Sequence, residues 1–248
     1  NWNTCALLKD CLVSLYAARP DGVFEVIVVD NASTDHSLEM LEKEYAGVKL
    51  IRNDVNKGFS KANNQGIRVA SGEYILLLNS DTVIEDRNAL KGWLDFMDQN
   101  ADVGASGCRL VFPDGRHQVG DAGFKPSLRT VLNHCFFLSR LFPRIMPGLF
   151  LSYGVMAAPL DVDWVCGAAF LVRRSILPQV GLMDESTFMY SEDVDWCYRM
   201  HEAGWKVFFF PEAQIYHYIG QSTGQRAFWS VMVRHLSMYQ FYRKHYSR

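Results

Sequence analysis

The chain has 248 residues, of which 49% are hydrophobic and 21% charged, an ordinary globular composition with enough length to bury a sizeable core. A formal net charge of -2 excludes a general attraction to nucleic acid, and no apolar run reaches the ~18 residues of a spanning helix. Six scattered cysteines without a C-x-x-C pair, and no signal peptide, predict a reduced protein in the cytoplasm.

The first part of the chain alternates between strand and helix patterns. Apolar residues at helical spacing predict helices, and short β-branched runs bounded by turn residues predict strands. The predicted elements are a helix at 7–15, strands at 25–30 and 48–53, a helix ending near Tyr45 and a helix at 58–70. Such alternation predicts a parallel sheet with right-handed crossovers.

The apolar run at 74–78 is the next predicted strand, and Asn79, Ser80 and Asp81 follow it directly. Its continuous Ile and Leu residues are typical of a strand buried on both faces. Ligands of open α/β sheets bind beyond the carboxyl ends of strands, so Asn79 and Asp81 would project into a binding crevice. The other interpretation is a simple Asx turn.

The remainder of the chain is less regular. Its predicted elements are a helix at 89–97, a strand at 103–111, a hairpin turn at 113–116, short helices and loops over the active face at 124–160, a strand at 162–172, a helix at 194–203 and a last strand at 205–210. His217 lies just beyond that strand. No repeat or linker divides the chain, which favours a single domain.

Several motifs occur in order: residues 28–35, 56–59 with Asn63, 79–81, 167–168, 192–195 and His217. Together they resemble the motifs of family 2 glycosyltransferases with the GT-A fold, most closely the bacterial rhamnosyltransferase-like branch. The resemblance implies an α/β class: a single Rossmann-like domain with a mixed, mostly parallel central sheet flanked by helices. Residues 1–110 would bind the nucleotide sugar, and residues 111–248 would bind the acceptor and form a C-terminal helical segment. The family's opening strand, before the loop at Trp2-Asn3, is missing here.

The resemblance implies an inverting transferase that moves a sugar, rhamnose as the first candidate, from a dTDP- or UDP-linked donor. The acceptor would be a hydroxyl of a cell-surface glycan or lipid-linked precursor. A divalent cation stabilises the diphosphate leaving group as a Lewis acid. Asp81 is the first candidate ligand for Mn²⁺ or Mg²⁺, and an imidazole from His217 would favour Mn²⁺. The competing interpretation of His217 is a packed histidine at a strand end.

Donor contacts are expected from residues that follow strands in the first half. Asp30 and Asn31 offer a carboxylate and an amide to base or ribose, although residues at this place also cap helices. Lys57 and Gly58 stand at a helix start, where phosphates bind, although Asn-Lys-Gly is also plain turn chemistry. By the family pattern, Asn79 holds the ribose side of the donor.

The acids Glu192 and Asp193 are the candidates for catalysis, because an inverting transfer needs a carboxylate that takes the proton of the acceptor hydroxyl. Acids in a first helical turn also favour the helix dipole, which is the purely structural interpretation. The family pattern assigns the base to Asp193 and a supporting, acceptor-orienting role to Glu192. Acceptor contacts are expected from Trp164 and Gly167.

Two other functions compete with transfer. A nicotinamide-dependent oxidoreductase would explain an acid at a strand end, but no G-x-G-x-x-G follows a strand. A sugar-nucleotide-binding module without turnover would not need the acid pair.

A peripheral contact with the inner face of the membrane is a further hypothesis: the aromatic and basic segment 226–245, with residues 136–151 and their Arg140 and Arg144, would lie on anionic lipid. These apolar residues would otherwise pack on the sheet.

Overall fold

The computed structural model describes residues 1–22, 24–143, 145–151, 158–218 and 227–246, with backbone only at 227–230. The described helices are α1 Cys5–Ala17, α2 Ser37–Glu44, α3 Phe59–Val69, α4 Ala89–Gln99, α5 Leu128–Cys135, α6 Leu138–Leu141, α7 Leu177–Val180, α8 Glu192–Glu202 and α9 Ala227–Tyr246. The described strands are β1 Ile27–Asp30, β2 Lys49–Arg52, β3 Tyr74–Leu78, β4 Thr82–Val83, β5 Val103–Val111, β6 Ala122–Gly123, β7 Leu160–Asp161, β8 Trp164–Val165, β9 Ala169–Arg173 and β10 Lys206–His217.

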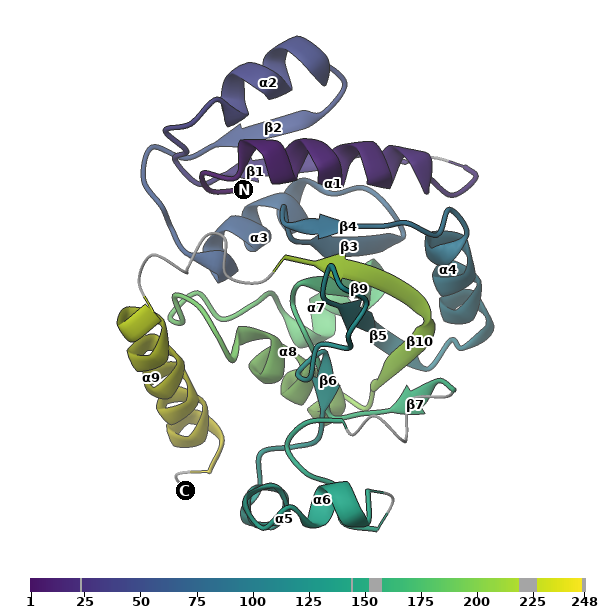
Figure 1. Ribbon diagram of the computed structural model, residues 1–248, viewed down its shortest axis with the longest axis vertical. Helices are drawn as coiled ribbons and strands as arrows, with labels where there is room; N and C mark the ends of the chain where they lie inside the picture. Colours follow the sequence, from purple (N-terminus) through teal and green to yellow (C-terminus); the bar gives the residue numbers. More distant parts are fainter. Residues whose placement is uncertain (23, 144, 152–157, 219–226, 247–248) are drawn as a thin grey trace.

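A six-stranded mixed sheet forms the centre of the molecule, in the order β3-β9-β5-β10-β4 with β7 also on β10 (Figure 1). Strand β10 runs parallel to β5, whereas β9 is antiparallel to both β3 and β5. Strands β1 and β2 form a separate parallel pair. The predicted α/β class, with a mixed sheet flanked by helices, is confirmed, and parallel pairing among the described strands is limited to β1 with β2 and β5 with β10.

The β1–β2 pair is not joined to the six-stranded sheet, since no described strand pairs with both β1 and β3. Asn1 lies beside the end of β1: its ammonium donates to the Val29 carbonyl at 2.8 Å, and its own carbonyl accepts from the Asn31 amide at 2.8 Å. This is the hydrogen-bond pattern of one residue in a parallel pair. The N-terminal residue is therefore fixed at the edge of the sheet where the candidate donor residues lie.

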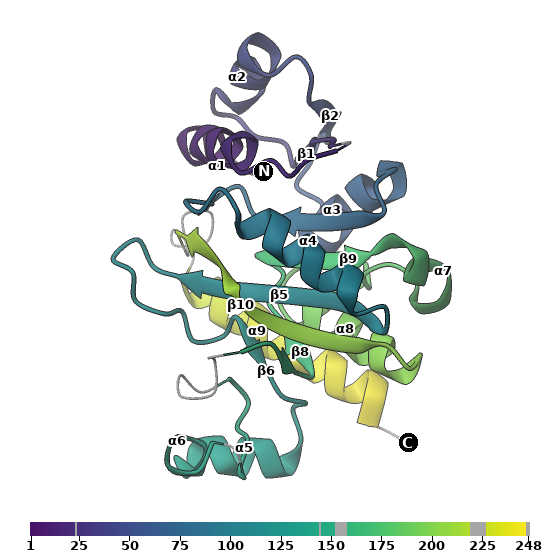
Figure 2. The ribbon, with the colours of Figure 1, turned by 90° about the vertical axis from the view of Figure 1, so that its right-hand side faces the viewer.

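The core lies on both faces of the six-stranded sheet because side chains alternate along each strand. Phe170 faces α8, where its ring stacks on Trp196 at 5.2 Å between centroids. Leu171 faces the other way, into the cluster that contains Trp93 and Met97 of α4. Figure 2 shows α4 and α8 on opposite sides of the sheet. Two apolar layers thus fix the sheet from which the site residues project.

Two predicted strands differ from the observed ones. The strand predicted at 162–172 is two strands, β8 and β9, because the Cys166 and Gly167 amides donate to Asp121 and Asp193 instead of to a neighbouring strand. The last strand does not end at Phe210. It continues through Pro211, where the register with β5 shifts as expected for a residue without an N–H, so that His217 lies in β10.

The segment predicted to hold short helices does so, in α5 and α6. Figures 1 and 2 both place these helices at the end of the molecule opposite α1 and α2. In the part of the chain that is described, no helix combines the length and apolar character required to cross a membrane.

Candidate functional site

The structure brings Asp81 and His217 together. Asp81 follows β3, and His217 ends β10, where it pairs with Thr82. The His217 Nε2 atom lies 3.4 Å from Asp81 Oδ1, and the two residues are only 9% and 8% exposed. The Tyr218 amide also donates to the Asp81 carbonyl at 2.8 Å, which fixes the two strand ends to each other. Two residues separated by more than a hundred positions therefore present one nitrogen and one carboxylate to the same point.

Gln118 orients the His217 ring. Its amide nitrogen donates to the carbonyls of His217 at 2.5 Å and Val111 at 3.2 Å, so its amide oxygen faces His217 Nδ1 at 3.1 Å. An amide oxygen only accepts, so the hydrogen bond with Gln118 uses a proton on Nδ1, and Nε2 is the ring nitrogen that faces Asp81. Nε2 and the Asp81 carboxylate are thus placed where both could bind one cation, with the Nδ1 bond orienting the ring.

The donor set fits a divalent metal held partly by substrate. Among the described residues no group of three or more His, Cys, Asp or Glu side chains is placed to hold a metal. Asp81 and His217 would supply one oxygen and one nitrogen ligand, and diphosphate oxygens and water would complete the coordination sphere, as is common for nucleotide-bound Mg²⁺ and Mn²⁺.

Glu192 and Asp193 begin α8, as predicted, and a strained backbone precedes them. Tyr190 and Ser191 have φ values of +71° and +63°, in the left-handed region that non-glycine residues rarely adopt. Such strain persists only where the surroundings enforce it, and it gathers at functional sites. Asp193, just after this turn, reaches the break between β8 and β9 at Gly167.

Asp193 is held by two backbone donors. Its Oδ2 accepts from the Gly167 amide at 3.0 Å, and its Oδ1 accepts from the Val194 amide at 2.8 Å. A Cβ at Gly167 would lie 3.2 Å from the Phe59 ring, a tight contact that glycine avoids. Gly167 thus lies against the predicted base, where it positions the carboxylate through its amide.

Burial raises the pKa of both acids. For Glu192 the loss of solvation is the largest cause and the charge of Asp193 adds to it, while for Asp193 burial outweighs the lowering by the Gly167 and Val194 amides. No described residue hydrogen-bonds to Glu192 Oε2. A carboxylate with a raised pKa is a stronger base, so the pair is suited to taking a proton from a hydroxyl.

Asn31 shapes the loop that carries Lys57 and Gly58. Its amide nitrogen donates to Asn56 Oδ1 and the Gly58 carbonyl, and its oxygen accepts from Asn53 Nδ2 and the Lys57 amide. All of its bonding groups face protein, so Asn31 positions the loop. Gly58 has φ +83°, a conformation that glycine adopts readily.

The other donor candidates divide into bonded and free groups. Asp30 is fully buried, and its oxygens accept from Asn1 Nδ2 and the Ser33 amide, both at 2.9 Å, so it stabilises a turn. No described residue hydrogen-bonds to the side chains of Lys57 or Asn79. Lys57 and Asn79 thus have side-chain groups available to a ligand, while donor contacts from Asp30 and Asn31 stay predictions.

Trp164 is buried, and its indole N–H donates to the Phe124 carbonyl at 3.2 Å. It lines a cavity of about 180 Å³ together with Lys125, Tyr198 and Val194, the neighbour of Asp193. The predicted acceptor residue thus forms part of a cavity that borders α8, the helix that begins with the acid pair.

Sequence reasoning missed the segment 117–121, which connects the two halves of the site. Gln118 orients His217, while the Asp121 carbonyl accepts from the Cys166 amide at 2.8 Å and its carboxylate pairs with His117 Nε2 at 2.8 Å. This segment follows an irregular turn, and nothing in its spacing indicated a site. Its polar residues between apolar ones were the one available signal.

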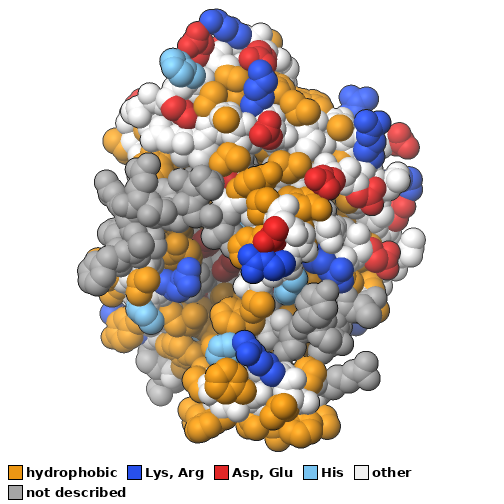
Figure 3. Space-filling model, in the orientation of Figure 1, with side chains coloured by type: hydrophobic (Ala, Val, Ile, Leu, Met, Phe, Trp, Pro, Cys, Tyr) orange, Lys and Arg blue, Asp and Glu red, His pale blue; other side chains and the backbone are white. Residues whose placement is uncertain are grey.

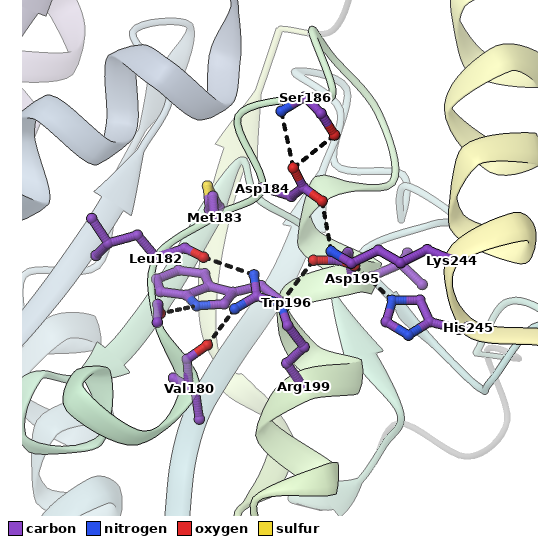
Figure 4. Close-up of polar contacts among 12 residues, drawn as sticks. Val180, Leu182, Met183, Asp184, Ser186, Asp195, Trp196, Arg199, Lys244 and His245 are labelled. Carbon is purple, nitrogen blue, oxygen red and sulfur yellow. Dashed lines mark hydrogen bonds and ion pairs between the residues drawn. The ribbon is translucent and has the colours of Figure 1, made fainter.

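Helix α9 is fixed to α8 through Asp195 (Figure 4). Asp195 Oδ1 bonds His245 Nε2 at 2.7 Å and Lys244 Nζ at 2.8 Å, and Asp195 Oδ2 bonds Arg199 Nε at 2.9 Å. Burial acts to raise the pKa of Asp195, but the bonds from Lys244 and His245 outweigh it and lower the pKa. The C-terminal basic residues Lys244 and His245 thus bind Asp195, which holds the helix of the candidate base in place.

The sequence was compared with protein-family models and with individual known proteins, and both comparisons give glycosyltransferases. The family model described as Glycosyl transferase family 2 matches residues 1–181. An N-acetylglucosaminyl-diphospho-decaprenol L-rhamnosyltransferase of Mycobacterium tuberculosis is 30% identical over 241 residues, covering 92% of this chain and 76% of its own length. Rhamnosyltransferase WbbL of Escherichia coli is 28% identical over 236 residues, covering 92% and 83%.

Solved structures share the fold. The mannosyltransferase PcManGT of Pyrobaculum calidifontis, in complex with GDP-Man and Mn²⁺, superimposes with a TM-score of 0.65 at 18% identity, covering 98% of this chain and 61% of that structure. S. aureus TarS 1-349 in complex with UDP gives a TM-score of 0.55 at 23% identity, covering 87% and 57%. The chain thus spans about three fifths of these structures. Since the family model matches well over half of its residues, the chain belongs to glycosyl transferase family 2.

Proposed function

We propose that this chain catalyses inverting transfer of a sugar, with rhamnose as the first candidate, from a dTDP- or UDP-linked donor to an acceptor hydroxyl, assisted by Mn²⁺ or Mg²⁺. The observation that carries the proposal is the Asp81 and His217 pair, in which an imidazole nitrogen and a carboxylate oxygen lie 3.4 Å apart. A bound cation would supply charge stabilisation to the departing nucleoside diphosphate.

The chain's own residues would divide the remaining work. Lys57 and Asn79, the free groups near the strand ends, would bind the donor, in a loop that Asn31 holds. Asp193 would take the proton of the acceptor hydroxyl, and the Gly167 amide would keep its carboxylate in place. Glu192 would orient the acceptor. The division at residue 110 does not separate these tasks, since the proposed metal pair takes Asp81 from one half and His217 from the other.

The names of the relatives support the substrate class. Two of them are called rhamnosyltransferases, and the name of one includes a diphospho-decaprenol group. For this chain we therefore propose a lipid-linked or glycan acceptor, and a peripheral contact with the membrane that carries it.

Thermal unfolding with a panel of nucleotide sugars, with and without Mn²⁺, tests the proposal. A ligand at ~100 times its dissociation constant adds ~2.7 kcal/mol of stability. We expect dTDP- or UDP-linked sugars to stabilise the protein in a Mn²⁺-dependent way, and Asp81→Ala to abolish both this effect and turnover. Asp95→Ala, which removes an exposed partner of Lys91, is the matched control. Full activity of Asp81→Ala in EDTA would refute the proposal, as would stabilisation by a nicotinamide cofactor alone. Stabilisation without any transfer would indicate a binding module.

A further inference from the structure

In the hairpin formed by α5 and α6, polar side chains are buried and apolar side chains are exposed to solvent. Its buried side chains include the polar residues Thr130, Asn133 and Ser139. Seven large apolar side chains in the hairpin and just after it are between 43% and 76% exposed: Leu128, Leu132, Phe136, Phe137, Leu141, Phe142 and Ile145. Helices that face water normally show the opposite arrangement, and an exposed apolar patch of this kind marks an interaction site.

The hairpin is well built, so the outward side chains are held in place. Ser127 and Thr130 form a capping box at the start of α5. Asn133 Nδ2 donates to the Pro147 carbonyl at 3.0 Å, and a side chain at Gly148 would lie only 2.7 Å from Ser139. The buried polar groups thus close the hairpin internally and leave its apolar side outward.

The charge of this surface has one sign. Residues 122–160 contain no Asp or Glu but four Lys or Arg. Arg129 and Arg140 are exposed, and the Arg140 guanidinium lies over the Phe137 ring at 5.4 Å from its centroid. Figure 3 shows hydrophobic side chains gathered at this end of the molecule beside basic ones, while the acidic side chains lie elsewhere on that face.

We propose that the α5–α6 hairpin is a docking surface for an anionic phospholipid bilayer. Aromatic and aliphatic side chains on an amphipathic surface enter the headgroup region, and flanking cations bind anionic headgroups. The absence of acids across the whole segment favours anionic lipid over a mixed-charge protein surface. This assigns the contact to α5 and α6. It does not extend to Lys244 and His245, which bind Asp195.

The segment before the hairpin also adjoins α8, the helix that begins with the acid pair. Lys125 and Pro126, just before α5, line the 180 Å³ cavity that Val194 and Tyr198 of α8 line as well. A docked bilayer would therefore lie on the side of α8 that borders this cavity, where a lipid-linked acceptor would arrive. This last step rests on the proposed function, whereas bilayer binding does not.

Vesicle flotation without substrate tests the docking surface independently of transfer. Vesicles of phosphatidylcholine with and without phosphatidylglycerol are compared at low salt and at high salt, which screens surface charge. The variants are Leu141→Asp, Arg129→Gln combined with Arg140→Gln, and the control Val13→Asp on α1, whose side chain is 56% exposed. A polarity-sensitive dye on Cys135, the one exposed residue of the six cysteines, reports insertion directly.

We expect binding that requires phosphatidylglycerol, falls with salt and shifts the dye emission to the blue. Leu141→Asp should weaken it at least tenfold with an unchanged unfolding temperature, and the double arginine variant by about 25-fold, since each cation near an anionic surface contributes about fivefold. Val13→Asp should bind as wild type does. The proposal is overturned if the protein does not float with anionic vesicles, or if Leu141→Asp and Val13→Asp bind equally. Self-association lost only in Leu141→Asp, without lipid binding, would make the hairpin a contact between copies.

Discussion

Replacing Gln118 by leucine tests whether this amide prepares His217 for a metal. The change removes three hydrogen bonds, two to the carbonyls of His217 and Val111 and one to His217 Nδ1, at a site only 2% exposed. Each group left buried and unpaired costs ~1–3 kcal/mol. In a chain of this length the unfolding temperature falls by ~2–4 °C for each kcal/mol. More specifically, losing the partner that orients a metal-binding histidine lowers metal affinity ~10–100-fold.

The assay is the Mn²⁺ concentration that gives half-maximal transfer. We expect it to rise ~10–100-fold in Gln118→Leu, with the rate at saturating Mn²⁺ near that of wild type. Gln118→Glu separates orientation from stability, because its carboxylate still accepts from Nδ1 but cannot donate to the two carbonyls. It should lower the unfolding temperature and largely keep the metal dependence. An unchanged metal requirement in Gln118→Leu, with the unfolding temperature lowered, would refute the assignment of Gln118 to the metal site.

Three further changes test the acid pair and the donor loop. Asp193→Asn keeps the bond from Gly167 but removes the base, so it should bind the donor normally and transfer ~10²–10⁴-fold more slowly; normal turnover would place the base elsewhere. Because the pKa of Glu192 is raised above its ordinary 4.5, ionisation of Glu192 destabilises the fold as pH rises from that value towards the raised pKa. Glu192→Gln should therefore gain stability over wild type in urea unfolding at pH 7.5 relative to pH 4, and an equal difference at both values would contradict this sign. Gly58→Ala would place a methyl group 2.6 Å from the Phe188 carbonyl, at a residue whose φ is positive. The positive φ by itself costs an alanine ~1–2 kcal/mol. Calorimetry should therefore show a lower unfolding temperature and weaker donor binding. Unchanged values would show that the loop adapts.

The sequence by itself determined the class and the ends of the strands that stop at Asp30 and Leu78. A short run of Ile and Leu followed by Asn79 and Asp81 has few interpretations, and periodicity placed the acids Glu192 and Asp193 at a helix start, where the structure has them. These features are local: they depend on the alternation of side chains and on turn chemistry within about ten residues. The order of the motifs supplied the family, which the comparisons confirm.

Only the tertiary structure showed which of these groups bond to the protein itself. Asn31 and Asp30 were predicted to bind the donor from their chemistry, and that stays a prediction; the structure adds their long-range hydrogen bonds to Asn53, Lys57 and Asn1. Gln118 gave no local signal, because its role depends on a contact across 99 positions. The hydrogen-bond donors and acceptors of a side chain bond to whichever groups the fold places near them. Strand pairing and the packing of layers decide which groups those are, and the spacing of residues along the chain does not reveal it.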